Sequence, residues 1–303
     1  MLADLFPGFD AETVDLGDVK LFVRLGGNVH APPLVCLHGF PETHVMWAKI
    51  APVLAQRFRL ILPDLPGYGW SSVPKVEPDH AQMSKRVLAR EIVALMSELG
   101  HERFTLLGHD RGARVGYRLA LDHPERLQRL ALLDIVPTLT MWQAIDSGLD
   151  LAPHWHWLAA PAPEPETRIG AAPDAWLHDT LLAWTKSKDA KVFGGKALAH
   201  YRAAFTVPER IAAACEDYRA GATLDRAADE ADLDSDRRIA VPTCVLWGGG
   251  GFPARTGRSP LDAWAPFMAD RALLTGEAID AGHFLPEEAP QATLAALVPF
   301  LWA

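Results

Sequence analysis

The 303-residue sequence has little of what marks several other classes of protein. Its only cysteines are Cys36, Cys215 and Cys244, too few and too scattered for a disulfide framework or a cysteine-rich metal site. No apolar run is long enough to span a bilayer, and the first residues lack the basic start of a secretion signal. We therefore expect reduced thiols, a cytoplasmic location and no membrane partner.

Positive charge is also scarce. The chain has 29 Lys and Arg against 38 Asp and Glu, a net charge of −9, which argues against nucleic acid as a partner. An anionic substrate would need a local cluster of arginines to bind it. What the chain has in quantity is apolar side chains, 49% of the residues, so it can bury a large core.

Apolar runs and helical patterns alternate over the first part of the chain. Residues 12–24 alternate apolar and polar side chains around a Gly-Asp pair, which predicts a β-hairpin. Continuous apolar runs, separated by helical patterns, follow at residues 34–37, 59–62, 104–108 and 130–133. This alternation predicts an α/β fold, a mostly parallel sheet with helices on both faces.

The alternation stops after residue 137. Residues 138–224 contain helical segments rich in Trp and Ala and no convincing strand. Strand patterns resume at 241–247 and 278–280, and a helix closes the chain at 290–301. We therefore predict a core made of residues 1–137 and 225–303, with a helical cap, residues 138–224, inserted after the sixth strand. Insertions at the carboxyl ends of strands lie over the active face, so the cap is expected to set specificity.

The chain is organised around residues 104–114, FTLLGHDRGAR. An apolar run ends at Gly108, Asp110 stands between Gly108 and Gly112, and a helical pattern follows at once. This is the strand, tight turn and helix of a nucleophile elbow, with an acid where esterases carry serine. The structural alternative is a glycine-rich connection in which Asp110 caps a helix.

Two further residues complete a catalytic pattern with Asp110. His283 follows the last predicted strand, at the same edge of the sheet as Asp110, and the order nucleophile first, histidine last is that of a Ser/Asp–acid–His hydrolase. The strand at 241–247 runs into four glycines, and no carboxylate occurs until Asp262. Asp134, at the tip of the strand 130–133, is therefore predicted to orient His283, the alternative being a turn or helix cap.

Arg111 and Arg114 lie three residues apart at the start of the helix after Asp110, so they can share a face. Two guanidinium forks suit a small carboxylate, and arginine at a helix N-terminus opposes the macrodipole. A bound anion explains that cost, whereas pairing with a neighbouring Asp is the structural alternative.

Five segments together make a family resemblance: residues 38–42 (HGFPE), 64–71 (DLPGYGWS), 108–114 (GHDRGAR), 132–134 (LLD) and 282–287 (GHFLPE). They resemble the fluoroacetate (haloacetate) dehalogenases of the α/β-hydrolase superfamily over essentially the whole chain. The resemblance implies that Asp110 displaces halide in an SN2 step and that His283, oriented by Asp134, activates a water against the resulting ester. It implies a small haloacid and water as partners, no metal or organic cofactor, and a homodimer.

The resemblance also assigns the binding residues. The substrate carboxylate is assigned to Arg111 and Arg114, and the oxyanion to the backbone N–H groups of Phe40 and Arg111. Halide is assigned to His154, Trp155 and Tyr218, with Trp184 as a further wall of the pocket. His156 and Trp157 follow immediately and leave a register one pair later open for the halide site.

Two other functions compete. An epoxide hydrolase shares the nucleophile, the histidine and the oxyanion loop but protonates the epoxide with two cap tyrosines, and Tyr201 and Tyr218 both fall in the cap. Arg111, Arg114 and the missing acid after Trp247 argue against it. A non-catalytic receptor on the same fold often lacks a triad member, whereas all three are present here.

Overall fold

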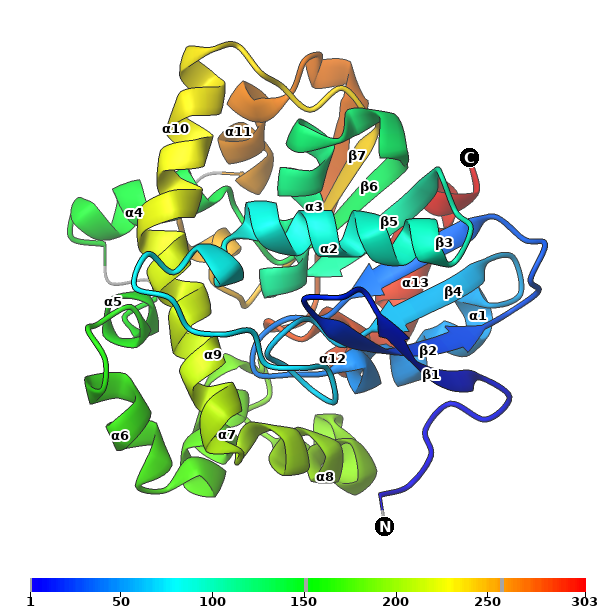
Figure 1. Cartoon of the computed structure of the whole chain (residues 1–303). Coiled ribbons are helices and arrows are strands. Elements are labelled where there is room, and N and C mark those ends of the chain that lie inside the picture. Colours follow the sequence, from blue (N-terminus) through cyan, green and yellow to red (C-terminus); the bar gives the residue numbers. More distant parts are fainter. Residues whose placement is uncertain (1, 150–151, 257–258) are drawn as a thin grey trace.

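A computed structural model describes residues 2–149, 152–256 and 259–303 (Figure 1). Eight strands form one sheet in the order β1-β2-β4-β3-β5-β6-β7-β8. The two pairings that involve β2, with β1 and with β4, are antiparallel, and all others are parallel. The strands are β1 (Asp10–Asp15), β2 (Lys20–Gly26), β3 (Pro33–Leu37), β4 (Arg59–Pro63), β5 (Phe104–His109), β6 (Leu127–Leu133), β7 (Thr243–Gly248) and β8 (Leu274–Ile279).

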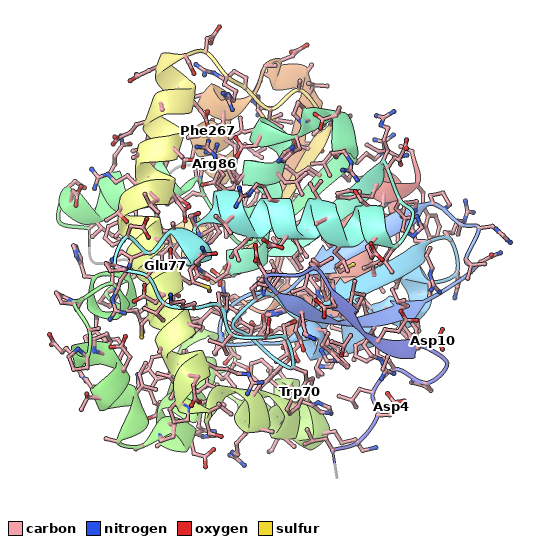
Figure 2. The ribbon with its side chains drawn as sticks, in the orientation of Figure 1. Asp4, Asp10, Trp70, Glu77, Arg86 and Phe267 are labelled. Atoms are coloured by element: carbon pink, nitrogen blue, oxygen red, sulfur yellow. The ribbon has the colours of Figure 1, made fainter. Side chains whose placement is uncertain are left out.

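The central strands are buried because helices cover both faces of the sheet. All six residues of β5 are buried, as expected for a continuous apolar run. Helices α2 (Lys85–Glu98) and α3 (Asp110–Asp122) cross one face, and α13 (Pro290–Trp302) lies on the other (Figure 1). Arg86 on α2, labelled in Figure 2, pairs with Asp122 at the end of α3 through Nε–Oδ2 at 2.9 Å. The predicted hairpin, the strands of the core and the α/β fold class are confirmed.

The cap follows β6, the sixth strand along the chain. It consists of helices, with no strand among the described residues between 138 and 224. Its helices are α4 (Thr138–Asp146), α5 (His154–Leu158), α6 (Glu164–Gly170), α7 (Pro173–Trp184), α8 (Gly194–Phe205) and α9 (Pro208–Ala220), with a 3₁₀ turn at Ala190–Val192.

The return from cap to core is made by one long helical rod (Figure 1). Helix α9 passes through a π-helical turn, Gly221–Asp225, into α10 (Arg226–Asp234) without a break. The division predicted between residues 224 and 225 therefore falls inside a continuous helical element, and a π turn marks the place. Such turns frequently accompany functional sites.

The other helical elements are short. Between β3 and β4 lies a 3₁₀ helix, His44–Lys49, followed by one helical turn, α1 (Ala51–Leu54), with a proline at its start. The remaining elements are 3₁₀ turns at Ala81–Met83, Pro124–Arg126, Pro253–Thr256, Ala265–Phe267 and Arg271–Leu273, and helices α11 (Pro260–Trp264) and α12 (Leu285–Glu288). None of the described helices has the length and apolar character needed to cross a membrane.

Candidate active site

Asp110 stands on a sharp turn between β5 and α3. Its φ of +44° lies in the left-handed region that side chains with a Cβ rarely adopt. The turn is possible because its flanks are glycine: a Cβ on Gly108 would lie 2.6 Å from Ala113 Cα, and one on Gly112 would lie 2.4 Å from the carbonyl oxygen of His38. The predicted elbow is therefore present, and the alternative in which Asp110 only caps a helix does not explain its strained backbone.

Asp110 is 8% exposed, and its carboxylate is held by the loop that follows β3. The Phe40 N–H donates to its Oδ1 at 3.0 Å, and the loop approaches so closely that a Cβ on Gly39 would lie 2.5 Å from Asp110 Cβ. Burial opposes ionisation, but the charges of His283 and Arg111 hold the pKa of Asp110 well below its ordinary value. Asp110 is consequently a carboxylate at neutral pH. The Phe40 N–H binds its Oδ1 and not its second oxygen, Oδ2.

His283 follows β8 and is oriented by Asp134, which follows β6. The His283 Nδ1–H donates to Asp134 Oδ2 at 2.6 Å, and Asp134 Oδ1 accepts the Gly248 N–H at 2.8 Å. Asp134 has a φ of +55°, so the chain turns sharply at this residue too. The other ring nitrogen of His283, Nε2, is buried and has no hydrogen-bond partner among the described residues.

A cavity of about 310 Å³ lies between these residues and the cap. It brings together Asp110, His283 and Asp134 from the core with Arg114 on α3 and, from the cap, His154, Trp155 and Trp184. The rest of its lining comes from Met141, Ala152, Pro153, Ala183, Lys188, Gly250, Gly251 and Phe252. Phe40, Arg111 and Tyr218 lie behind this lining and contact it rather than form it. The described residues include no cluster of three or more His, Cys, Asp or Glu side chains placed to hold a metal ion.

The cap side chains assigned to halide form one aromatic group. The His154 ring lies 4.6 Å from the Trp184 ring and 5.9 Å from the Tyr218 ring, centroid to centroid. Trp155 packs edge-on against Tyr218 at 6.0 Å. Burial lowers the pKa of His154 to about 3, so its imidazole is neutral and offers one N–H donor.

The alternative halide pair, His156 and Trp157, packs against other aromatic side chains of the cap. His156 packs against Trp142, with ring centroids 5.4 Å apart, and Trp157 stacks on Trp176 at 5.9 Å. Neither lines the cavity. Of the two pairs, it is therefore the first, His154 and Trp155, that lines the cavity together with Asp110.

The two arginines differ in their surroundings. Arg114 is 3% exposed; its Nη1 donates to the Val136 carbonyl at 3.1 Å and to Thr138 Oγ1 at 3.0 Å, and its Nε has no partner. No carboxylate lies within ion-pair distance of it in the part of the chain that the structure describes, and burial lowers its pKa. Arg111 is instead paired with Asp217 on α9, through Nε–Oδ1 at 2.9 Å. The alternative weighed from the sequence, pairing with an Asp, is thus realised for Arg111 and not for Arg114.

Sequence reasoning missed two buried clusters beside the site. One is the pairing of Arg111 with Asp217. The other joins Glu42, Glu287 and Tyr201, whose hydroxyl donates to Glu287 Oε1 at 2.9 Å. Burial raises the pKa of both glutamates, and as carboxylates they would leave three oxygens without a donor, which protonation of the pair relieves. His109 Nδ1 lies 2.9 Å from Glu42 Oε2, but outside hydrogen-bond geometry. Glu42 belongs to the HGFPE segment and Glu287 to the GHFLPE segment, which are the local signals for this second cluster.

The chain is similar in sequence and structure to several known proteins. A family model for the alpha/beta hydrolase fold matches residues 32–290. A fluoroacetate dehalogenase from Burkholderia sp is 40% identical over 98% of this chain and 95% of its own. A soluble epoxide hydrolase from Corynebacterium sp. (strain C12) is 30% identical over 86% of each chain. The crystal structure of ALR0039 from Nostoc sp PCC 7120 has a TM-score of 0.91 at 44% identity, covering 97% of this chain and 98% of that one.

These similarities extend over core and cap alike, and the named relatives carry two different activities. Which chemistry this chain performs must therefore be argued from its own cavity.

Proposed function

The chain belongs to the α/β-hydrolase fold family, and on that premise we propose that it hydrolyses 2-haloacids of the fluoroacetate type to 2-hydroxyacids and halide. One observation carries the proposal: the ionised Asp110 and the buried, unpaired Arg114 line the same cavity. A buried guanidinium without a counter-ion is costly, and a substrate carboxylate offsets that cost. Neither a haloalkane nor an epoxide offers one.

The first step is displacement at a saturated carbon. Phe40 N–H holds Oδ1 of Asp110, so Oδ2 attacks the carbon that bears the halogen, opposite the halide. The new C–O bond forms as the C–halogen electron pair leaves with the halide. His154, Trp155 and Tyr218 are proposed to donate to that halide, since a leaving group as strongly hydrated as fluoride needs several donors in a dry pocket.

The second step frees the enzyme. Nε2 of His283 takes a proton from a water, which attacks the carboxyl carbon of Asp110. The oxyanion then forms on Oδ1, where the Phe40 N–H already donates, with the backbone N–H of Arg111 proposed as the second donor. Collapse of this intermediate expels the 2-hydroxyacid oxygen, which takes the proton from His283. Arg114 and Arg111 are proposed to hold the substrate carboxylate throughout.

The cap, residues 138–224, is proposed to supply the halide site. The three cysteines are free and buried, in keeping with the proposed cytoplasmic location. We also propose a homodimer as the working form, on the family resemblance; sedimentation or light scattering of the purified protein measures this.

Epoxide hydrolysis is the second candidate, because a relative of that name covers most of the chain. It requires two tyrosine hydroxyls over the nucleophile. The Tyr201 hydroxyl is bound to Glu287 and does not reach the cavity, and those of Tyr68 and Tyr117 are bound to Asp217 and Asp229. Tyr218 alone has a hydroxyl with no hydrogen bond to the rest of the described chain, which leaves the pair incomplete.

The decisive experiment compares substrates side by side. Halide release from fluoroacetate and chloroacetate is followed with ion-selective electrodes, and diol formation from styrene oxide is followed on the same preparation. The proposal predicts halide release at a rate far above diol formation. Diol formation without halide release would contradict it and favour the second candidate.

A further inference from the structure

Arg111 and Asp217 form a buried ion pair beside the cavity. Arg111 Nε donates to Asp217 Oδ1 at 2.9 Å, and Nη2 donates to the same carboxylate and to the Asp217 carbonyl at 2.8 Å. Both side chains are buried, at 1% and 0% exposure. Three contacts from one residue fix the orientation of the guanidinium, while Nη1 has no acceptor among the described residues.

Asp217 is itself held from both sides. Lys85 Nζ, at the start of α2, donates to its Oδ1, and the Tyr68 hydroxyl donates to its Oδ2 at 2.9 Å. Although burial opposes ionisation, the charges of Arg111 and Lys85 hold the pKa of Asp217 below its ordinary value. Lys85 Nζ also lies 3.5 Å from Asp225 Oδ2, so two cations and two carboxylates share this buried cluster.

The neighbour of Asp217 on α9 is Tyr218, the proposed halide donor. The Arg111 guanidinium carbon lies 4.1 Å from the centroid of the Tyr218 ring, a cation–π contact. The π turn begins three residues later, and a Cβ on Gly221 would lie only 3.3 Å from Arg111 Nη2. The guanidinium is therefore packed between Tyr218 and the backbone of the rod.

We infer that Asp217 is a positioning residue for the proposed dehalogenation: it fixes Arg111, at the carboxylate end of the substrate, and Tyr218, at the halide end, relative to each other. In-line displacement needs carboxylate, carbon and leaving group at set places, and a misplacement of about 1 Å can cost about a hundredfold in rate. The inference rests on the proposed function, because it concerns the two ends of a haloacid.

The chain contains a matched control for the test. Arg118, two turns further along α3, pairs with Asp229 on α10 through Nη2–Oδ1 at 2.9 Å. Asp229 also accepts the Tyr117 hydroxyl at 2.9 Å, just as Asp217 accepts Tyr68. Asp229 is fully buried, but neither it nor Arg118 lines the cavity. Asp229 is nevertheless linked to Arg114 through the Tyr117 and Thr138 hydroxyls, so the control is made at the other partner of Arg118. Asp232 pairs with Arg118 Nη1, is 3% exposed and does not line the cavity, and Asp232→Asn removes that ion pair.

Steady-state kinetics with fluoroacetate and bromoacetate, together with urea unfolding, are measured for wild type, Asp217→Asn and Asp232→Asn. Both variants are expected to lose stability. Only Asp217→Asn is expected to lose kcat/KM for fluoroacetate, by about a hundredfold, with a raised KM and a smaller loss for bromoacetate, whose leaving group depends less on donors. If Asp217→Asn does not fold, the double variant Asp217→Asn/Lys85→Met, which removes one charge of each sign, is measured instead, with the same kinetic loss expected.

The outcomes separate the two claims. Wild type that releases no halide from either acid would contradict the proposed function. Wild type that does release halide, with Asp217→Asn (or the double variant) matching Asp232→Asn in KM, kcat and the ratio of fluoroacetate to bromoacetate turnover, would overturn the positioning role alone.

Discussion

His283 Nδ1 lies 2.6 Å from Asp134 Oδ2, and the opposite ring nitrogen, Nε2, is buried at the cavity with no hydrogen-bond partner among the described residues. The contact with Asp134 places the ring proton on Nδ1 and leaves the Nε2 lone pair free for a water. A histidine held this way can act as the base in the proposed second step.

Replacing His283 by alanine is therefore expected to stop the reaction halfway. Asp110 remains ionised beside Arg111 and Arg114, so halide is released once and the ester stays on Asp110. Intact-mass measurement after incubation with bromoacetate should show the added carboxymethyl group, and peptide mapping should place it on Asp110. Asp110→Asn is the control and should carry none; a His283→Ala protein without adduct would contradict the two-step scheme.

Arg114→Gln is expected to raise KM for haloacetates roughly ten- to a hundredfold, the worth of a charge-assisted hydrogen bond or two. For bromoacetamide, which has no carboxylate, KM should change little in this variant. Arg118→Gln on the same helix is the control, because its guanidinium is paired with Asp229 and Asp232 away from the cavity. An unchanged KM in Arg114→Gln would make this arginine structural.

The two cap tyrosines are expected to behave differently. Tyr218→Phe removes a proposed halide donor and should lower kcat for fluoroacetate more than for bromoacetate, by about tenfold or more. Tyr201→Phe removes the hydroxyl that donates to Glu287 at 2.9 Å and should cost about 1–2 kcal/mol of unfolding free energy with little change in kcat. Equal kinetic losses in both variants would revive the epoxide-hydrolase alternative.

The buried Glu42–Glu287 pair predicts a particular pH dependence of stability. Burial raises the pKa of Glu42 to about 8 from an ordinary value of 4.5, so the folded protein keeps a proton that the unfolded chain releases. The contribution of the protonated Glu42 to the free energy of unfolding is complete below about pH 4.5. It is lost as the pH rises toward about 8, at about 1 kcal/mol per pH unit. Urea unfolding across that range should show the decline in wild type and a shallower one in Glu42→Gln. Parallel slopes would mean that Glu42 is ionised in the folded state.

Much of the site could be predicted from the sequence because its signals are local. Gly108 and Gly112 flank Asp110 since no Cβ fits there, and His283 and Asp134 each follow a strand of the parallel sheet, whose carboxyl ends meet at one edge. The absence of an acid after β7 was enough to single out Asp134.

The features that were missed depend on distant pairing. Asp217 lies 106 residues from Arg111, and Tyr201 lies 86 residues from Glu287, so no periodicity or spacing connects them. The predicted boundary after residue 224 falls inside the continuous helical rod from α9 to α10, because a π turn leaves no simple mark in the sequence. The different surroundings of Arg111 and Arg114 likewise arise only when folding brings Asp217 of α9 against Arg111.

The central claim is that an Asp110 oxygen attacks carbon and that water later attacks the Asp110 carboxyl carbon. A single turnover with enzyme in excess, run in heavy-oxygen water, tests it most directly. The account predicts that the heavy oxygen enters the Asp110 carboxylate, detected by mass spectrometry of the peptide that contains it, and that the first hydroxyacid released carries none. Heavy oxygen in that first product, with an unlabelled Asp110, would show that water attacks the substrate directly and would contradict the account.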